Sequence, residues 1–181
     1  MLLKALLLGA FAGAIGTQAS AEAFKLSSST ISEGGKLGLA QVFKGFGCEG
    51  GNVSPDLSWS NAPQGTKSFA VTVYDPDAPT GSGWWHWNVV NISPSVSSIK
   101  SGASATGTLP AGAAQIKNDY GASAFGGACP PPGEVHRYIF TVYALGVDKL
   151  DLPKDASNAL AGFMIRANAI DQASITAVYN R

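Results

Sequence analysis

The polar residues best suited to chemistry lie where apolar, alternating segments of the sequence end or begin. Asp75 ends one such segment, His86 begins the next, and His136 begins a third, much later in the chain. The sequence contains 2 histidines, and both occupy such a position. Tyr138 lies on the same face as His136, because strand side chains repeat every two residues. If the three segments are neighbouring strands, these side chains meet in one pocket.

These residue types suit three kinds of site. Imidazole and tyrosine groups donate hydrogen bonds, which fits an anion such as phosphate or carboxylate. Two histidines and an aspartate also resemble the ligand set of a divalent metal. The same groups can act as general acid and base in hydrolysis. Each residue also has a structural interpretation, as a packed histidine or a turn-forming aspartate, and spacing alone does not choose among them.

The segment that follows Asp75 contains more than a hairpin connection requires. Residues 75–79 read Asp-Pro-Asp-Ala-Pro, whereas a turn needs only Gly, Asn or Asp to set its backbone angles. Because each proline fixes a backbone angle, we expect a stiff loop that holds acidic side chains in place. Arg137 is expected to pair with Asp77 or Glu134 and so to join two loops. The tryptophans after the loop are interpreted as packing residues, with a pocket wall as the second choice.

Apolar alternation predicts three strands, and one segment near the end has helical periodicity. The strands cover residues 68–74, 86–92 and 136–146. The helix covers residues 159–170, with Asp155 or Ser157 as its cap. Weaker signals predict strands at 23–26, 36–41, 57–59 and 175–179. Residues 93–127 carry little regular signal, and a loop of that length in a compact domain is unusual unless it has a function.

The strand at 86–92 carries apolar residues on both faces. Regular alternation places His86 and Ile92 on the face opposite Trp87. We therefore expect this strand and its partner at 68–74 to lie centrally in a sheet that is covered on both sides.

Composition limits the class of partner. The chain has 181 residues, 45% of them hydrophobic and 13% charged, so a single packed domain over residues 22–181 is expected. Basic and acidic residues both number 12, which gives a formal net charge of zero. This balance argues against a nucleic-acid partner and against electrostatic docking to an anionic membrane.

The first 21 residues have the pattern of a secretory signal peptide. Lys4 precedes an apolar stretch over residues 5–15, and Ala19-Ser20-Ala21 has the small-x-small form of a cleavage site. The stretch is short for a bilayer span, although an uncleaved anchor is the alternative. We predict an exported protein, periplasmic or secreted, with no integral membrane span after signal cleavage.

Two cysteines, Cys48 and Cys129, remain for the exported chain. In an oxidising compartment such a pair more often forms a disulfide than stays free, so we predict a Cys48–Cys129 bridge. Two separate buried thiols are the alternative. A zinc site is disfavoured because the sequence has no Cys-x-x-Cys or paired His-Cys spacing.

Two long motifs resemble those of the phosphatidylethanolamine-binding protein family. The first is the Asp-Pro-Asp-Ala-Pro segment at 75–79, ending in His86, and the second is GACPPPGEVHRY at 127–138. Shorter matches are Asn-Val-Ser-Pro at 52–55 and Asn-Asp-Tyr-Gly at 118–121. The short gap before His136 is similar to the bacterial and archaeal branch, often called Raf-kinase-inhibitor-like proteins. The similarity covers about residues 24–179.

This resemblance implies a mainly β fold, in which a large central antiparallel sheet packs on a smaller sheet and helices lie at the periphery. It also implies a small pocket at the sheet edge that accepts phosphate or phosphoryl head groups. The ligand-binding residues it implies are Asp75, Pro79, Trp84, His86, Pro131, His136 and Tyr138. Two departures are Ala128, where a proline is common, and Phe163, where bacterial members often have a histidine.

We therefore predict a non-enzymatic binding module for a small phosphoryl or carboxylate ligand, without cofactor, metal ligands or catalytic residues. The sequence has no Gly-x-Ser-x-Gly elbow and no evident activated nucleophile. One alternative is a protein-interaction or inhibitory role toward a protease or kinase, suggested by the loop at 93–127. A metal-dependent hydrolase is the other.

Overall fold

The structure, a computed structural model, describes residues 22–181. The predicted signal peptide, residues 1–21, lies outside the described residues, and its cleavage stays a prediction. No helix within residues 22–181 is long and apolar enough to cross a bilayer.

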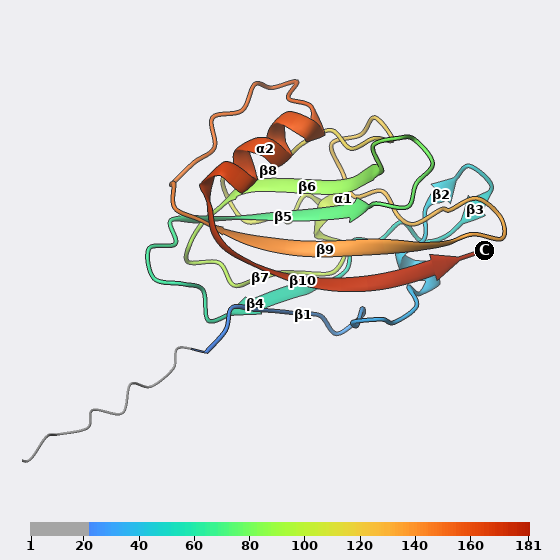
Figure 1. Ribbon diagram of the computed structural model, residues 1–181, viewed down its shortest axis with the longest axis horizontal. Helices are drawn as coiled ribbons and strands as arrows, with labels where there is room; N and C mark the ends of the chain where they lie inside the picture. Colours follow the sequence, from blue (N-terminus) through green and yellow to red (C-terminus); the bar gives the residue numbers. More distant parts are fainter. Residues whose placement is uncertain (1–21) are drawn as a thin grey trace, which may run out of the picture.

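The fold is built on a five-stranded antiparallel sheet with the order β10–β9–β5–β6–β8 (Figure 1). The strands are β5 (Ser68–Asp75), β6 (Trp84–Ile92), β8 (Ala114–Gln115), β9 (Val135–Leu145) and β10 (Ala169–Asn180). The three strands predicted from apolar alternation are thus neighbours, with β5 between β6 and β9. Because both pairings are antiparallel, the end of β5 lies beside the start of β6 and the start of β9.

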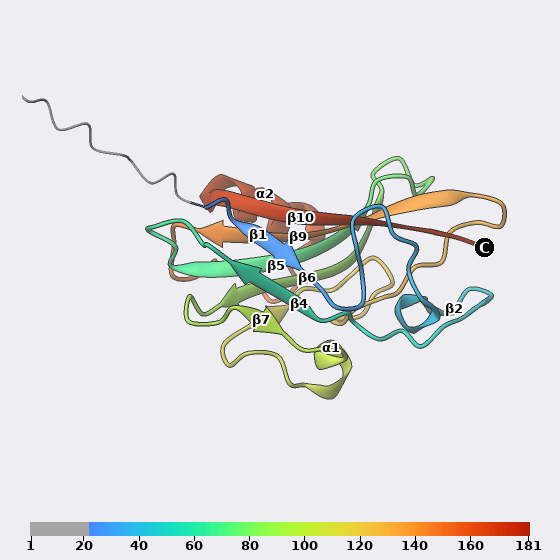
Figure 2. The ribbon, with the colours of Figure 1, turned by 90° about the horizontal axis from the view of Figure 1, so that it is seen from below.

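A smaller three-stranded sheet covers the inner face of the large one (Figure 2). It consists of β1 (Lys25–Ser27), β4 (Leu57–Ser60) and β7 (Ser98–Ile99). Trp59 from the small sheet packs on Phe69 of β5, with ring centroids 5.3 Å apart. Val71, Val73 and alternate residues of β9 point into the same core, as their alternation predicts. The two packed sheets confirm the expected fold class.

The outer face of the large sheet carries α2 (Asn158–Asn168), above β6 and β5 in Figure 1. Ala161 and Ile165 of the helix are buried against this face. Ser157 is the cap, since its side chain accepts a hydrogen bond from the Leu160 backbone at 3.1 Å. The helix ends before the predicted position because Ala169 pairs with Leu145 and begins β10.

The weaker predictions had mixed outcomes. Residues 36–41 do not form a strand: a 3-10 turn at Leu39–Gln41 takes their place, because the Gln41 N–H bonds Gly38 at 3.0 Å. The segment at 93–127 contains β7, α1 (Ala103–Thr106) and β8. It is also anchored to β6 by backbone hydrogen bonds from Ile116 to Asn88 and from Gly126 to His86.

A short hairpin of β2 (Lys44–Gly45) and β3 (Cys48–Glu49) projects beside the end of the large sheet. A disulfide joins Cys48 in this hairpin to Cys129 in the segment that leads to β9. This is the pairing expected from the sequence. It fixes two loops that are 81 positions apart.

Two bulges in β6 overturn the predicted alternation of that strand. Val73 pairs with Trp87 and Tyr74 with Trp85, so His86 is an extra residue. As a result His86 and Trp87 lie on the same, inner side. Asn91, with φ of 61°, forms a second bulge that returns Ile92 to the inner core. Bulges redirect side chains in this way and are common next to functional sites.

Candidate ligand-binding site

A cavity of about 240 Å³ opens where β5 ends and β9 begins. All the ligand-binding residues predicted from the sequence line it: Asp75, Pro79, Trp84, His86, Pro131, His136 and Tyr138. The remaining lining residues are Phe46, Ala78, Thr80, Tyr120, Cys129 and Pro130. The fold therefore brings the polar ends of three separate strands to one place.

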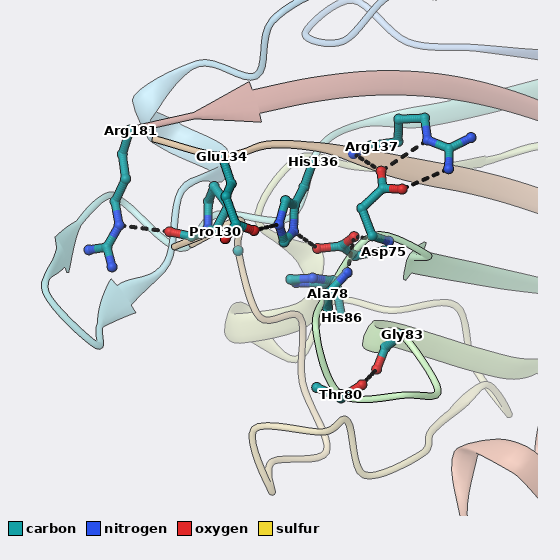
Figure 3. A network of polar contacts seen from close by, with 12 residues as sticks. Asp75, Ala78, Thr80, Gly83, His86, Pro130, Glu134, His136, Arg137 and Arg181 are labelled. Carbon is teal, nitrogen blue, oxygen red and sulfur yellow. Dashed lines mark hydrogen bonds and ion pairs between the residues drawn. The ribbon is translucent and has the colours of Figure 1, made fainter. Parts of the chain in front are cut away.

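At the base of this cavity, His136 is paired with Asp75. His136 Nδ1 lies 2.7 Å from Asp75 Oδ2, and both side chains are almost fully buried (Figure 3). The second carboxylate oxygen of Asp75 accepts hydrogen bonds from the backbone N–H groups of Asp77 and Ala78, at 2.8 and 3.1 Å. Asp75 thus closes its own turn and fixes the His136 ring.

The other nitrogen of His136 faces a second carboxylate. His136 Nε2 lies 3.0 Å from Glu134 Oε2, and the Glu134 side chain is 52% exposed. Since carboxylates only accept, both contacts are hydrogen bonds in the imidazolium form, which carries N–H on each nitrogen. Burial lowers the pKa of His136, but hydrogen bonds to Glu134 and Asp75 outweigh burial and raise it above its ordinary value.

His86 is held in the neutral form, whereas His136 is held as the imidazolium. Its Nδ1 lies 2.7 Å from the Gly126 carbonyl, which can only accept, so Nδ1 carries the proton. Burial lowers the pKa of His86, and the hydrogen bond to Gly126 only partly opposes this. The ring is therefore neutral near pH 7, and Nε2 presents a lone pair.

Three buried polar atoms of the cavity residues have no hydrogen-bond partner among the described residues. They are His86 Nε2, the Tyr138 hydroxyl and Trp84 Nε1. Burial raises the pKa of Tyr138, so its hydroxyl keeps its proton. Leaving one such group unpaired costs about 1–3 kcal/mol. All three belong to residues that line the same cavity.

The long segment before the cavity keeps His86 in place. The Tyr120 hydroxyl donates to the Gly127 carbonyl at 3.0 Å, and the Gly127 N–H donates to Asn52 Oδ1 at 2.7 Å. Asp119 accepts from the Trp85 backbone at 2.7 Å. These bonds explain why the two shorter motifs, at 52–55 and 118–121, accompany the longer ones. The segment at 93–127 is thus a support for the cavity.

An ion pair beside the cavity ties the 75–79 loop to β9. Arg137 donates to both carboxylate oxygens of Asp77, at 2.7 and 2.9 Å (Figure 3). The hydrogen bond from Arg137 is the main cause that lowers the pKa of Asp77 to about 2, against the opposing effect of burial. Of the two pairings expected for Arg137, the structure contains the one with Asp77; Glu134 contacts His136.

The outer rim of the cavity is aromatic and cross-linked. Phe46, at the tip of the β2–β3 hairpin, is 71% exposed and lines the cavity. Behind it, Phe43 stacks on Tyr120 with centroids 3.9 Å apart. The disulfide holds the two sides of the rim together, as does Arg181, which donates to the Pro130 carbonyl at 2.7 Å and to the Phe46 carbonyl at 3.2 Å. The rim is thus tied at two points.

The metal-triad alternative fits this arrangement poorly. His86 uses Nδ1 on a backbone carbonyl, and both nitrogens of His136 are engaged by carboxylates. Across residues 22–181, no three His, Cys, Asp or Glu side chains group in a way that could hold a metal ion.

Sequence reasoning missed several contributors to the cavity. Tyr120 belongs to the Asn-Asp-Tyr-Gly match and had a usable signal there. Phe46 and Thr80 lie in Gly-rich turns, and no pattern distinguished them. Glu134 was noted only as a partner for Arg137, although it lies inside the second motif.

Comparison with known proteins agrees with this geometry. The family model described as phosphatidylethanolamine-binding protein matches residues 27–180. The chain belongs to the phosphatidylethanolamine-binding protein family. Escherichia coli K12 YbcL, a UPF0098 protein, is 51% identical over 180 residues, which is 98% of each chain. E. coli YbhB is 47% identical over 157 residues, covering 86% of this chain and 99% of YbhB.

The fold is also shared with solved members of the family. The crystal structure of E. coli YbcL, described as a new member of the mammalian PEBP family, superposes with a TM-score of 0.85 at 53% identity. That match covers 87% of this chain and 98% of YbcL. A homologue from Chlamydia trachomatis matches with a TM-score of 0.74 at 31% identity, over 88% of this chain and 98% of its own. The family membership that the two sequence motifs suggested is therefore confirmed.

Proposed function

We propose that this protein is an exported, non-catalytic binding module whose cavity takes a phosphoryl group or a similar small anion. The observation that carries the proposal is the set of three unpartnered polar atoms on His86, Tyr138 and Trp84. Family membership supports it, since the family is described by its binding of a phospholipid.

The three atoms define what the ligand must offer. The Tyr138 hydroxyl and Trp84 Nε1 supply N–H or O–H donors, so the ligand needs oxygen acceptors. Neutral His86 presents an acceptor at Nε2, so the ligand also needs one donor. A phosphoryl group that retains one proton meets both needs, as does a protonated carboxyl. A fully deprotonated anion such as sulfate meets only the first.

Several features support binding without turnover. The Thr80 hydroxyl is engaged by the Gly83 carbonyl, and Cys129 is in the disulfide. The pKa of Tyr138 is raised by burial, which disfavours its anion. The hydroxyl and sulfur groups that line the cavity are therefore not activated as nucleophiles.

A titration followed by NMR tests this function. We expect inorganic phosphate and phosphoethanolamine to move the ring resonances of His86 and His136, with sulfate binding more weakly. Tyr138→Phe removes one donor and is expected to weaken phosphate binding about tenfold. Tyr143→Phe, a buried tyrosine of the same strand on the opposite face, is the matched control. Histidine resonances that do not move at millimolar phosphate would contradict the proposal.

A further inference from the structure

Glu134 is not a lining residue of the proposed anion-binding cavity, but its carboxylate contacts His136, which is one. Glu134 Oε2 lies 3.0 Å from His136 Nε2, the nitrogen that Asp75 leaves free (Figure 3). His136 is 2% exposed, whereas the Glu134 side chain is 52% exposed. A half-exposed carboxylate therefore occupies a buried donor of a cavity-lining residue.

We propose that Glu134 is a specificity-determining residue that acts as an intramolecular competitor, occupying the His136 Nε2–H donor that an incoming anion would use. The proposal rests on the function proposed above, and it concerns a fourth polar group of the same cavity. An anion that binds His136 must first displace Glu134 or share the donor with it.

The charges around the cavity also predict that Glu134 weakens anion binding. Asp75 and Glu134 bring two negative charges, and one imidazolium at His136 balances one of them. His86 is neutral. Within the group of Asp75, His136 and Glu134 one negative charge stays unbalanced, and it repels dianions more strongly than monoanions or zwitterions. The Arg181 guanidinium, which donates to the Pro130 carbonyl at the rim, opposes this effect from the other side.

The backbone at Glu134 is fixed by hydrogen bonds, but the Glu134 side chain is free to rotate. Glu134 lies in a turn in which its N–H bonds the Pro131 carbonyl at 3.2 Å, and the Gly133 N–H bonds the Arg181 carbonyl at 2.9 Å. Among residues 22–181, the Glu134 side chain has one hydrogen-bond partner, His136. Rotation of the side chain toward solvent frees the donor without a change in the fold.

Three variants separate the effect of the Glu134–His136 hydrogen bond from the effect of the negative charge on Glu134. Glu134→Ala removes both, and we expect phosphate to bind about fivefold more tightly, which corresponds to ~1 kcal/mol. Glu134→Gln removes the charge but keeps an acceptor, so a smaller gain is expected. Glu134→Asp keeps the charge on a side chain that is one methylene shorter, which loosens the contact. Glu49→Gln, an exposed carboxylate of β3 outside the cavity lining, controls for net charge.

The readout is the phosphate dissociation constant by calorimetry, together with the His136 pKa by NMR. Tighter binding in Glu134→Ala, with a lower His136 pKa and an unchanged Glu49→Gln protein, supports the competitor role. If Glu134→Ala binds phosphate as tightly as the native protein or more weakly, the competitor role is wrong. The proposed function still holds in that case, because the native protein binds phosphate. If neither the native protein nor Glu134→Ala binds phosphate, both proposals fail.

Discussion

His136 Nδ1 lies 2.7 Å from Asp75 Oδ2 across 61 positions of sequence, and this buried pair joins the two signature motifs. The antiparallel pairing of β5 with β9 makes the contact possible, because it brings the end of one strand to the start of the other. The site is therefore a direct product of sheet topology.

The two histidines should titrate in opposite directions. We expect the pKa of His136 to lie above 6.5 and that of His86 below it. His136 then stabilises the fold below its unfolded pKa, and this contribution is lost as pH rises through its folded pKa. As pH falls, His86 is protonated in the unfolded chain before it is protonated in the folded protein. The free energy of unfolding therefore decreases as pH drops below about 6.5. Ring nitrogen shifts measured against pH check this, and two ordinary pKa values would contradict it.

Removal of Asp75 should destabilise the protein. Asp75→Ala removes the buried carboxylate from His136 Nδ1, leaves the half-exposed Glu134 as the remaining partner, and opens the turn at Asp77 and Ala78, at a cost of about 3 kcal/mol. Urea unfolding measures the loss. Asp151→Ala, at an exposed position, should change stability by about 0.5 kcal/mol or less. A loss for Asp75→Ala no larger than that control would count against a structural role for the pair.

The ion pair of Asp77 with Arg137 should make the free energy of unfolding depend on pH in the acid range. The pKa of Asp77 falls from 3.8 to about 2 in the folded state, so its contribution is present above 3.8 and is lost as pH falls toward 2. Asp77→Asn should therefore lower stability at neutral pH and flatten the dependence between those values. Unfolding free energies measured from pH 2 to 5 test this, and a parallel curve for the variant would refute it.

The disulfide should contribute to stability and to the shape of the cavity. Replacing Cys48 and Cys129 by serine releases a crosslink between residues 81 apart, which costs about 4 kcal/mol in the chain-entropy model. Because Cys129 and Phe46 both line the cavity, weaker phosphate binding is also expected. Denaturation and calorimetry of the double variant measure both effects. Unchanged stability would show that other contacts fix the rim.

Much of the fold was predictable from the sequence because local pattern and tertiary structure agree there. Alternation from Phe69 to Val73 and through β9 matches the two faces of the sheet. The motifs located the cavity residues because they end and begin adjacent strands.

Other features depend on long-range pairing that local pattern does not encode. The bulge at His86 is set by the register of β6 with Val73 and Tyr74, so regular alternation wrongly put His86 and Trp87 on opposite faces. The end of α2 is set by the pairing of Ala169 with Leu145. The contact of Glu134 with His136 spans two residues along the chain, but it depends on the turn at 131–134.

A crystal structure grown near pH 7 with phosphate tests the central claim most directly. The predicted result is tetrahedral density in the cavity, within hydrogen-bond distance of His86 Nε2 and the Tyr138 hydroxyl. Density for phosphate elsewhere, with the cavity filled by water alone, would contradict it.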